Sequence, residues 1–261
     1  MPQMNRRQIL RQLAAALPLS VALPALAAPL GKGSPTGKKG WAGDDADDHK
    51  NFGVHWCYNW GANGRGGDGI EFVPMVKHGS DLSQLDGIGE LPGLKHLLGF
   101  NEPERQDQGN VSIDQALQLW PKLAEFAAKK NIPLGSPAPS SDGGGMAWLT
   151  EFMRQAKRQK LRVDFIAIHW YRSHDVSAFS AWLNELERNF RLPVWLTEFN
   201  GWSGTEPQNY EFLRGALHAL EHAKHVERYA YFEPGAGKPH SLYKADRTLS
   251  RMGELYRDAG T

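Results

Sequence analysis

Residues 97–104 read LLGFNEPE, an apolar run that stops abruptly at an amide, a carboxylate and a proline. The apolar half has the length and composition of one buried strand in an α/β protein. Pro103 cannot continue a hydrogen-bonded ladder or donate to one, so the strand must end before it. In a barrel of parallel strands, reactive side chains are found where the strands end, which makes Glu102 a candidate.

A second stretch, residues 193–201, reads PVWLTEFNG and has the same organisation. An apolar strand ends in Glu198, and an amide and a glycine follow at Asn200 and Gly201. Because the carboxyl ends of parallel strands meet at one edge, two such endings place two carboxyl groups on one rim. We therefore predict that Glu102 and Glu198 face a shared opening.

Length, charge and cysteine content narrow the classes of protein. A chain of 261 residues fits one barrel, since barrels of about 250 residues are routinely single domains. The formal charge of +1 gives no electrostatic reason to expect binding to nucleic acid or to an anionic membrane. The single cysteine, Cys57, cannot form an intramolecular disulfide, so the core alone must stabilise the fold.

The N-terminal residues 1–27 have the three parts of an export signal: a charged start, a short apolar run and a small-residue exit at 25–27. The paired Arg6 and Arg7 resemble a twin-arginine signal, so we expect a periplasmic or secreted protein. The alternative is an amphipathic helix of the mature domain. Residues 28–50, rich in Gly, Lys, Pro and Asp, are typical of a flexible linker, which leaves 51–261 as a single domain.

Strand and helix signals alternate through this domain, which predicts an α/β fold with a parallel sheet, closed into a (β/α)8 TIM-type barrel. Seven strands can be recognised, and the eighth, or a reduced or missing element, is expected in the glycine-rich stretch 78–95. An open doubly wound sheet is the alternative, although the dinucleotide-binding glycine turn is missing. The expected strands are 52–60, 71–77, 96–100, 131–139, 163–171, 193–199 and 227–234, and the expected helices are 113–130, 148–160, 179–190, 209–222 and 249–256.

Two carboxyl groups on one rim are the requirement for cleaving a glycosidic bond. One must donate a proton to the leaving oxygen, while the other must be ionised to attack or stabilise the sugar carbon. The neighbours of the two glutamates suit this division. Asn101 can bind a sugar hydroxyl, and Tyr171 can donate to a glutamate that is held ionised.

The motifs GFNEPE at 99–104, HWY at 169–171 and WLTEF at 195–199 together resemble glycoside hydrolase family 128, endo-β-1,3-glucanases of the large clan A of retaining glycosidases. The similarity covers roughly residues 50–258. It implies that Glu102 is the general acid/base, that Glu198 is the nucleophile and that Asn101 contacts the substrate 2-hydroxyl. It also implies that Tyr171 steers the nucleophile and that the barrel is pared down. Asn200 departs from the family, where a glycine is common, and we expect it to affect a subsite.

Further substrate contacts are expected from aromatic and histidine side chains at strand ends or in the loops that follow, because flat rings suit sugar faces. About half of these rings are expected to line the opening and half to seal the barrel. Glu104 and Glu233 also lie beside prolines at strand ends and compete for the catalytic assignment. The expected substrate-binding residues are Asn101, Tyr58, Trp60, His169, Trp170, Tyr171, Trp202 and Phe232.

The sequence therefore predicts a retaining endo-glucanase that hydrolyses β-1,3-glucan, acts as a monomer and needs no cofactor. The histidines His55, His169, His174 and His240 invite a metal hypothesis, but the best of them end separate strands, so we expect no metal. A non-catalytic glucan-binding protein on a degenerate barrel is the main alternative, and a metal-dependent polysaccharide deacetylase is a third. Linkage specificity follows from the family resemblance only, because fold alone does not identify a substrate.

Overall fold

The structure is a computed structural model that describes residues 36–260. The expected export signal at 1–27 and the beginning of the expected linker lie outside the described residues. In the described part, no helix is both long enough and apolar enough to cross a membrane.

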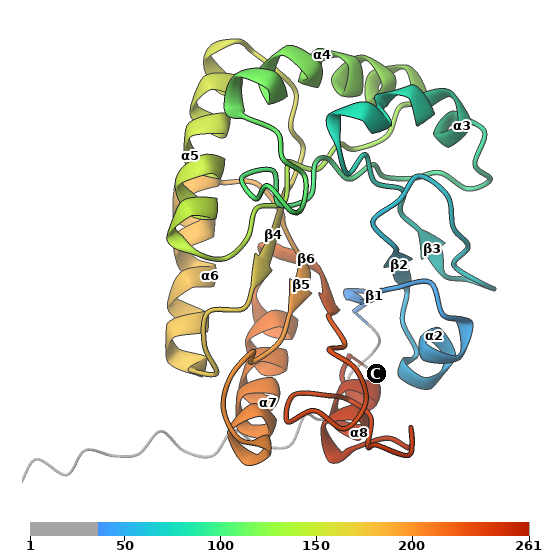
Figure 1. The fold of residues 1–261 in the computed structure, drawn as a ribbon, viewed down its shortest axis with the longest axis vertical. Coiled ribbons are helices and arrows are strands. Elements are labelled where there is room, and N and C mark those ends of the chain that lie inside the picture. The colour runs from blue at the N-terminus through green and yellow to red at the C-terminus, as the bar shows by residue number, and fades with distance from the viewer. Residues whose placement is uncertain (1–35, 261) are drawn as a thin grey trace, which may run out of the picture.

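Six parallel strands form one sheet in the order β3-β2-β1-β6-β5-β4. The sheet brings the first strand of the described chain against the last, which places the blue β1 beside the orange-red β6 in Figure 1. The strands are β1 (Lys39–Ala42), β2 (Trp56–Tyr58), β3 (Glu71–Phe72), β4 (Ile166–Trp170), β5 (Val194–Phe199) and β6 (Val226–Tyr231).

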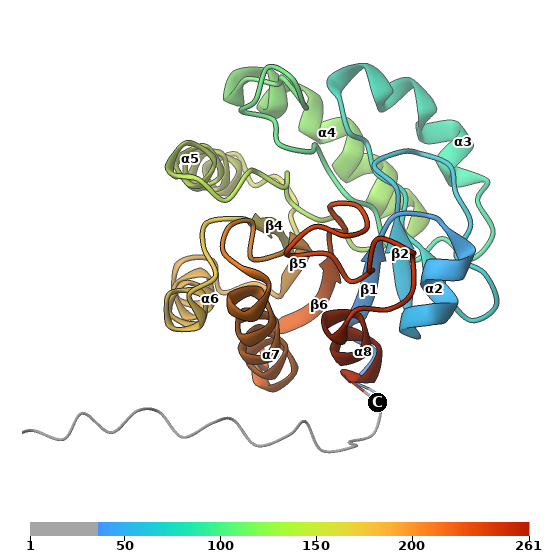
Figure 2. The same ribbon diagram turned by 60° about the horizontal axis from the view of Figure 1, so that its bottom comes forward.

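Two further extended segments connect the edges of this sheet. Just beyond β3, Met75 forms a parallel bridge with Leu98, and the neighbouring Leu97 bridges to Leu134. Gly135 then bridges to Phe165, immediately before β4. Eight parallel segments therefore follow one another around a ring, with the helices outside it (Figure 2). The predicted α/β barrel is confirmed, and Leu97–Phe100 is its fourth segment while β5 is its seventh.

The helices begin and end where the sequence supplies caps. The helix predicted at 113–130 is confirmed: Ser112 accepts from the Gln115 amide at its start, and Asn131 ends it in the left-handed conformation. Asp142 and Asp175 cap the next two helices in the same way. The helices are α2 (Ala46–Phe52), α3 (Leu85–Gly89), α4 (Ile113–Lys130), α5 (Gly143–Arg158), α6 (Val176–Phe190), α7 (Glu206–His222) and α8 (Arg251–Asp258), with one 3-10 helix, η1 (Gly79–Gln84).

The apolar residues form an inner core and two outer cores. The inner core fills the barrel with rings and small side chains, among them Trp56, Tyr58 and Trp195. Trp60 and Phe232 pack on top of it and are only partly buried. The outer cores lie between strands and helices, as expected when each strand sends alternate side chains to opposite faces.

The expectation of a flexible linker over residues 28–50 is wrong from Lys39 onward. Lys39 begins the buried strand β1, and its ammonium group donates to the carbonyls of Tyr256, Arg257 and Ala259 at the end of α8. The acidic residues that follow are part of the folded domain. The side chain of Asp45 accepts hydrogen bonds from the amides of Asp47 and Asp48 and so caps the start of α2. Lys39 and Asp45 here satisfy helix ends, a use that composition alone does not reveal.

The missing eighth strand is therefore β1, and its expected location within 78–95 is wrong. That stretch contains η1 and the short α3 in place of a strand and a long helix, so the expected reduction of the barrel is present there. With the early strand counted, Glu102 follows the fourth strand of the barrel and Glu198 lies near the end of the seventh.

Candidate active site

Glu102 sits on a tightly built turn directly after the fourth barrel segment. Its amide donates to the carbonyl of Ala138 at 2.7 Å, and its own carbonyl accepts from the amides of Arg105 and Gly109. A side chain at Gly109 would collide with the Asn101 carbonyl, so the close approach of the chain requires glycine. The backbone of Glu102 is left-handed, with φ of 39°. Such strain in a residue other than glycine marks functional sites.

Glu198 is the second-last residue of β5 and is almost completely buried, and three neutral donors hold its carboxylate. Tyr58 donates to one oxygen at 2.9 Å, and the indole N–H of Trp60 donates to the same oxygen at 2.7 Å. The hydroxyl of Tyr171 donates to the other oxygen, the contact that the sequence analysis expected from Tyr171. These donors come from β2, the loop after β2 and the loop after β4, so three parts of the barrel fix the orientation of one carboxylate.

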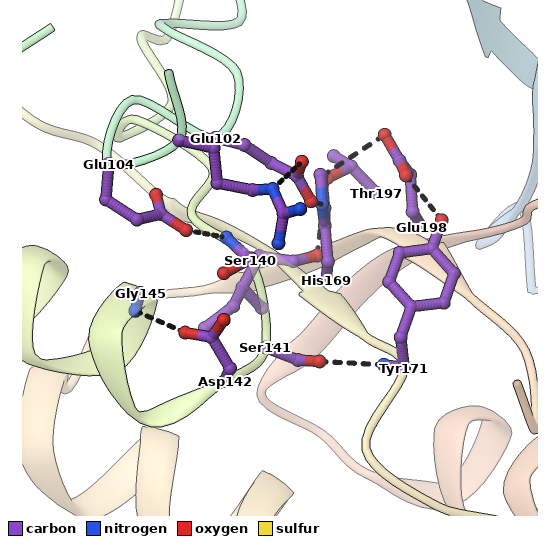
Figure 3. A network of polar contacts seen from close by, with 12 residues as sticks. Glu102, Glu104, Ser140, Ser141, Asp142, Gly145, His169, Tyr171, Thr197 and Glu198 are labelled. Carbon is purple, nitrogen blue, oxygen red and sulfur yellow. Dashed lines mark hydrogen bonds and ion pairs between the residues drawn. The ribbon is translucent and has the colours of Figure 1, made fainter. Parts of the chain in front are cut away.

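His169 connects the two glutamates, as Figure 3 shows. Its Nδ1 lies 3.2 Å from Oε1 of Glu102 in hydrogen-bonding geometry, and its Nε2 lies 3.3 Å from Oε1 of Glu198. Burial lowers the pKa of this fully buried imidazole, but the charge of Glu198 and the hydrogen bond and charge of Glu102 outweigh it. The net pKa is therefore raised above the usual 6.5. One ring thus contacts both carboxylates, which proves that they meet at one place.

The two tyrosines beside Glu198 are held in their protonated form. Burial is the largest cause that raises the pKa of Tyr58 and of Tyr171, and the charge of Glu198 and the hydrogen bond to it add to the effect. Both hydroxyls therefore remain donors.

Glu102 and Glu198 open into a cavity of about 600 Å³, here called the rim cavity. Asn101 is buried in its wall, and its Oδ1 accepts no hydrogen bond from the described residues, so it is available to a ligand. Arg105 stands at the edge with Nε 3.6 Å from Oε2 of Glu102. The lining residues are Trp60, Lys77, Asn101, Glu102, Arg105, Gln108, Ser140, Ser141, Asp142, Tyr171, Arg172, Glu198, Trp202 and Phe232.

Trp202 is the most exposed large apolar side chain of the described residues, at 59%. Its backbone is left-handed, with φ of 55°, and its amide donates to Oδ1 of Asn200 at 2.8 Å. The side-chain amide of Asn200 in turn donates to the carbonyl of Phe232 at 3.1 Å. A buried asparagine therefore fixes an exposed ring at the mouth of the rim cavity, beside the ring of Tyr171.

Three of the expected substrate contacts, Tyr58, His169 and Trp170, do not line the rim cavity. His169 is fully buried between the two glutamates. Trp170 is 2% exposed and packs among the outer rings of Phe179 and Trp182, because it follows His169 along β4 and therefore points to the opposite face of the sheet. Tyr58 is completely buried and reaches Glu198 from behind without lining the cavity. Trp60, Trp202 and Phe232 do line it.

The two glutamates that competed for the catalytic assignment, Glu104 and Glu233, accept hydrogen bonds from nearby loops and have structural roles. Glu104 accepts from the amide of Ser140, which holds the loop before α5, and Glu233 accepts from Ser241 and from the amides of Gly235 and Leu242. Sequence reasoning missed the N–H of Trp60 as a donor to Glu198 and the arginines of the cavity. Only Arg105 carried a signal, since it follows Glu102 by one turn.

Within residues 36–260, no group of three or more His, Cys, Asp or Glu side chains is placed to hold a metal ion. His169 is the histidine closest to both carboxylates. Its Nδ1 contacts Glu102, and its Nε2 faces Glu198.

Comparison with known proteins gives a consistent result. The family model described as "Glycosyl hydrolase catalytic core" matches residues 36–256. A curated relative, Alkali-sensitive linkage protein 1 of Schizosaccharomyces pombe, is 35% identical over 248 residues, which cover 85% of this chain and 45% of that protein. The chain thus spans about half the length of this relative.

Two solved structures are similar to most of the chain. One is an endo-β-1,3-glucanase of glycoside hydrolase family 128, subgroup I, from Amycolatopsis mediterranei with laminaritriose; it is 30% identical, with a TM-score of 0.73 and coverage of 85% of this chain and 98% of that one. The other is a curdlan-specific exo-β-1,3-glucanase of subgroup III from Blastomyces gilchristii with glucose; it is 30% identical, with a TM-score of 0.72 and coverage of 86% and 99%.

Proposed function

The chain belongs to glycoside hydrolase family 128, and from this premise we propose that it is a retaining endo-glucanase that hydrolyses β-1,3-glucan. Glu198 acts as the nucleophile and Glu102 as the general acid/base. The observation that carries the proposal is the contact of both carboxylates with His169 at the edge of one cavity. Glycosidases use two carboxyl groups on either side of the scissile bond in this way.

The environment of each glutamate fits its proposed role. The three donors on Glu198 satisfy an ionised carboxylate and aim it at a single position, as a nucleophile requires. Glu102 makes fewer contacts, with His169 and the half-exposed Arg105, and it lies where a proton can be exchanged with a leaving oxygen or with water.

Double displacement then proceeds in two balanced steps. In the first, Glu198 forms an ester bond to the anomeric carbon while the glycosidic C–O bond breaks and Glu102 transfers its proton to the departing oxygen. In the second, Glu102 removes a proton from water as that water attacks the anomeric carbon and releases Glu198. His169 stays between the carboxylates and holds Glu102 in place throughout.

Substrate binding is assigned to the remaining surface of the rim cavity. The free acceptor of Asn101 receives a sugar hydroxyl, and Trp60, Trp202 and Phe232 offer ring faces to pyranose rings. The glucan-bound relative from Amycolatopsis mediterranei supports β-1,3-linked glucose as the substrate class.

Digestion of a soluble β-1,3-glucan tests the proposal. We expect a mixture of oligosaccharides whose new reducing ends are first released as the β-anomer, which NMR of an early time point detects. Tight binding without release of reducing ends would instead identify a non-catalytic glucan-binding protein. Release of glucose alone would point to exo action, and first release of the α-anomer would exclude a retaining mechanism.

Export of the chain is a separate proposal that rests on residues 1–27. The paired arginines and the apolar run that follows them are the supporting pattern. A fusion of residues 1–27 to a reporter that folds in the cytoplasm should be exported by a bacterium with a twin-arginine pathway. Replacement of Arg6 and Arg7 by lysine should abolish export. Undiminished export of the lysine variant would refute the twin-arginine route.

A further inference from the structure

A second cavity lies beside the rim cavity, on the other side of the loop that follows Glu102. It measures about 640 Å³, and Gln108 lines both cavities. Consecutive residues of this loop line different cavities: Arg105 lines the rim cavity, and Gln106 lines the second cavity. The two spaces are therefore neighbours along one surface, separated by a single loop.

Carboxamides dominate the lining of this second cavity, here called the amide cavity. Four of the eleven glutamines of the chain are present together with one asparagine, so the concentration of amides at this place is specific. Its lining within the described range contains no carboxylate, lysine or arginine. The amide-bearing residues are Gln106, Gln108, Asn110, Gln115 and Gln118.

Most of these amides are free to bind a ligand. The side chains of Gln106, Gln108, Asn110 and Gln118 make no hydrogen bond to any residue in the part of the chain that the structure describes. Only Gln115 is engaged, because its Oε1 accepts from the amide of Ser112 at the start of α4. A carboxamide offers both an acceptor and two donors, which suits the adjacent hydroxyl groups of a neutral sugar.

The loop that carries the amides is fixed to the loop that carries Glu102. The amide of Asn110 donates to the carbonyl of Arg105, and the amide of Val111 donates to the carbonyl of Pro103 at 2.8 Å. Asn110 itself is left-handed, with φ of 47°, and Gly109 packs against the Asn101 carbonyl without room for a side chain. The amide cavity therefore has a defined position relative to Glu102, as a preorganised binding site needs.

We propose that the amide cavity binds glucosyl units of the β-1,3-glucan chain that extend past the rim cavity. This inference rests on the proposed glucanase function. A neutral, amide-rich lining with the small apolar surfaces of Val111 and Leu119 selects a neutral polyhydroxylated ligand over an ion. The shared Gln108 gives one continuous polysaccharide a path from the scissile bond into this second space.

Gln118→Ala, alone and with Gln106→Ala, tests the proposal. Gln118 is exposed on α4, where alanine favours the helix, so folding is preserved. The measured quantity is kcat/KM for β-1,3-gluco-oligosaccharides of increasing length. We expect each substitution to lower the ratio of kcat/KM for long over short substrates by about 3- to 10-fold, because one or two hydrogen bonds to the substrate are lost. The change should come from a higher KM for the long substrates.

Gln159→Ala, an equivalent change on the exposed end of α5 away from both cavities, is the matched control and should leave that ratio unchanged. If the ratio of kcat/KM for long over short substrates is unchanged in the Gln118 and Gln106 variants, the inference is overturned. Hydrolysis of β-1,3-glucan by the wild-type chain would still leave the proposed function intact. If the wild-type chain hydrolyses no β-1,3-glucan of any length, the proposed function itself fails. Direct binding of a long oligosaccharide to Glu198→Gln, weakened by the added Gln118→Ala, distinguishes the two failures.

Discussion

The two ends of the barrel each contain carboxylate, histidine and tryptophan side chains, but they use them differently. At the amino ends of the strands, Glu71 pairs with Arg228 at 2.7 Å and with His96 at 2.6 Å. The Arg228 guanidinium also lies 4.2 Å from the centre of the Trp195 ring. We call Glu71, His96, Arg228 and Trp195 the floor cluster. At the carboxyl ends, Glu198 has only neutral donors and the shared His169 around it.

This difference explains why one end is structural and the other reactive. A permanent cation neutralises Glu71, and burial, which raises its pKa, is outweighed by His96 and Arg228, so the net pKa of Glu71 is lowered. Such a carboxylate is satisfied within the protein. Glu198 keeps a fixed orientation without a permanent counter-charge of its own and faces a cavity. Burial alone does not identify a catalytic carboxylate; the type of partner and access to a ligand do.

The largest expected effect comes from removing the charge at the rim. Glu198→Gln keeps the size of the side chain but removes the nucleophile, so kcat for β-1,3-glucan should fall by about 10³-fold or more. The melting temperature should fall less than in a floor variant, because no ion pair with a lysine or arginine is lost. Glu71→Gln is the matched control on the floor and should behave in the opposite way, with reduced stability and unchanged kcat per folded molecule.

Breaking the floor cluster from its cationic side comes next. Arg228→Met leaves Glu71 largely buried without its permanently charged partner, which should lower the free energy of unfolding by about 3 kcal/mol. This change can be measured by urea denaturation, with tryptophan fluorescence as the signal. A large loss of kcat in the folded variant, without a loss of stability, would contradict the division between floor and rim.

A smaller effect is expected when one donor to Glu198 is lost. Tyr171→Phe removes a hydrogen bond to a charged group, worth roughly 1.5–3 kcal/mol, so kcat should fall about 10- to 100-fold with the fold intact. Tyr256→Phe is a useful control, because that buried hydroxyl donates to the Gly40 carbonyl far from the cavity. It should reduce stability and leave kcat unchanged; equal effects of the two substitutions on kcat would argue against a positioning role for Tyr171.

The smallest effect is a pair of opposite pH dependences. The pKa of His169 is raised, so its contribution to stability is complete below 6.5 and is lost as pH rises through the higher folded value. The pKa of Glu71 is lowered, so its contribution is present above 4.5 and is lost as pH falls through the lower folded value. The stability difference between wild type and His169→Gln should therefore shrink with rising pH, and that for Glu71→Gln should shrink with falling pH. Slopes of the same sign would contradict this comparison.

The sequence was sufficient for much of the fold because the relevant signals are local. Leu97–Phe100 and β5 are apolar strands closed by chain breakers, and α4 has its own cap, its own apolar periodicity and an asparagine end. The strand β1 was not recognisable, because it is four residues long and begins with a lysine. The ammonium group of that lysine donates hydrogen bonds to carbonyls at the end of α8, more than two hundred residues away in the chain. Partners at such a distance leave no local pattern.

The same limit applies to the site. The two glutamates could be predicted from strand ends, and Tyr171 from its motif. Which way each ring points depends on strand register, so Trp170 was wrongly assigned to the cavity when it faces the outer core. The inward turn of Trp60 depends on its left-handed backbone, with φ of 60°, which its sequence neighbours do not dictate.

The central claim is that Glu198 forms a covalent bond to the sugar, and trapping that intermediate tests it most directly. A 2-deoxy-2-fluoro-β-laminaribiosyl fluoride slows both steps but keeps a good leaving group, so the glycosyl ester accumulates. Mass spectrometry of the intact protein should show the mass of one glycosyl group added, and peptide mapping should place it on Glu198. Continued hydrolysis of glucan without any adduct, or an adduct on another carboxylate, would contradict the account.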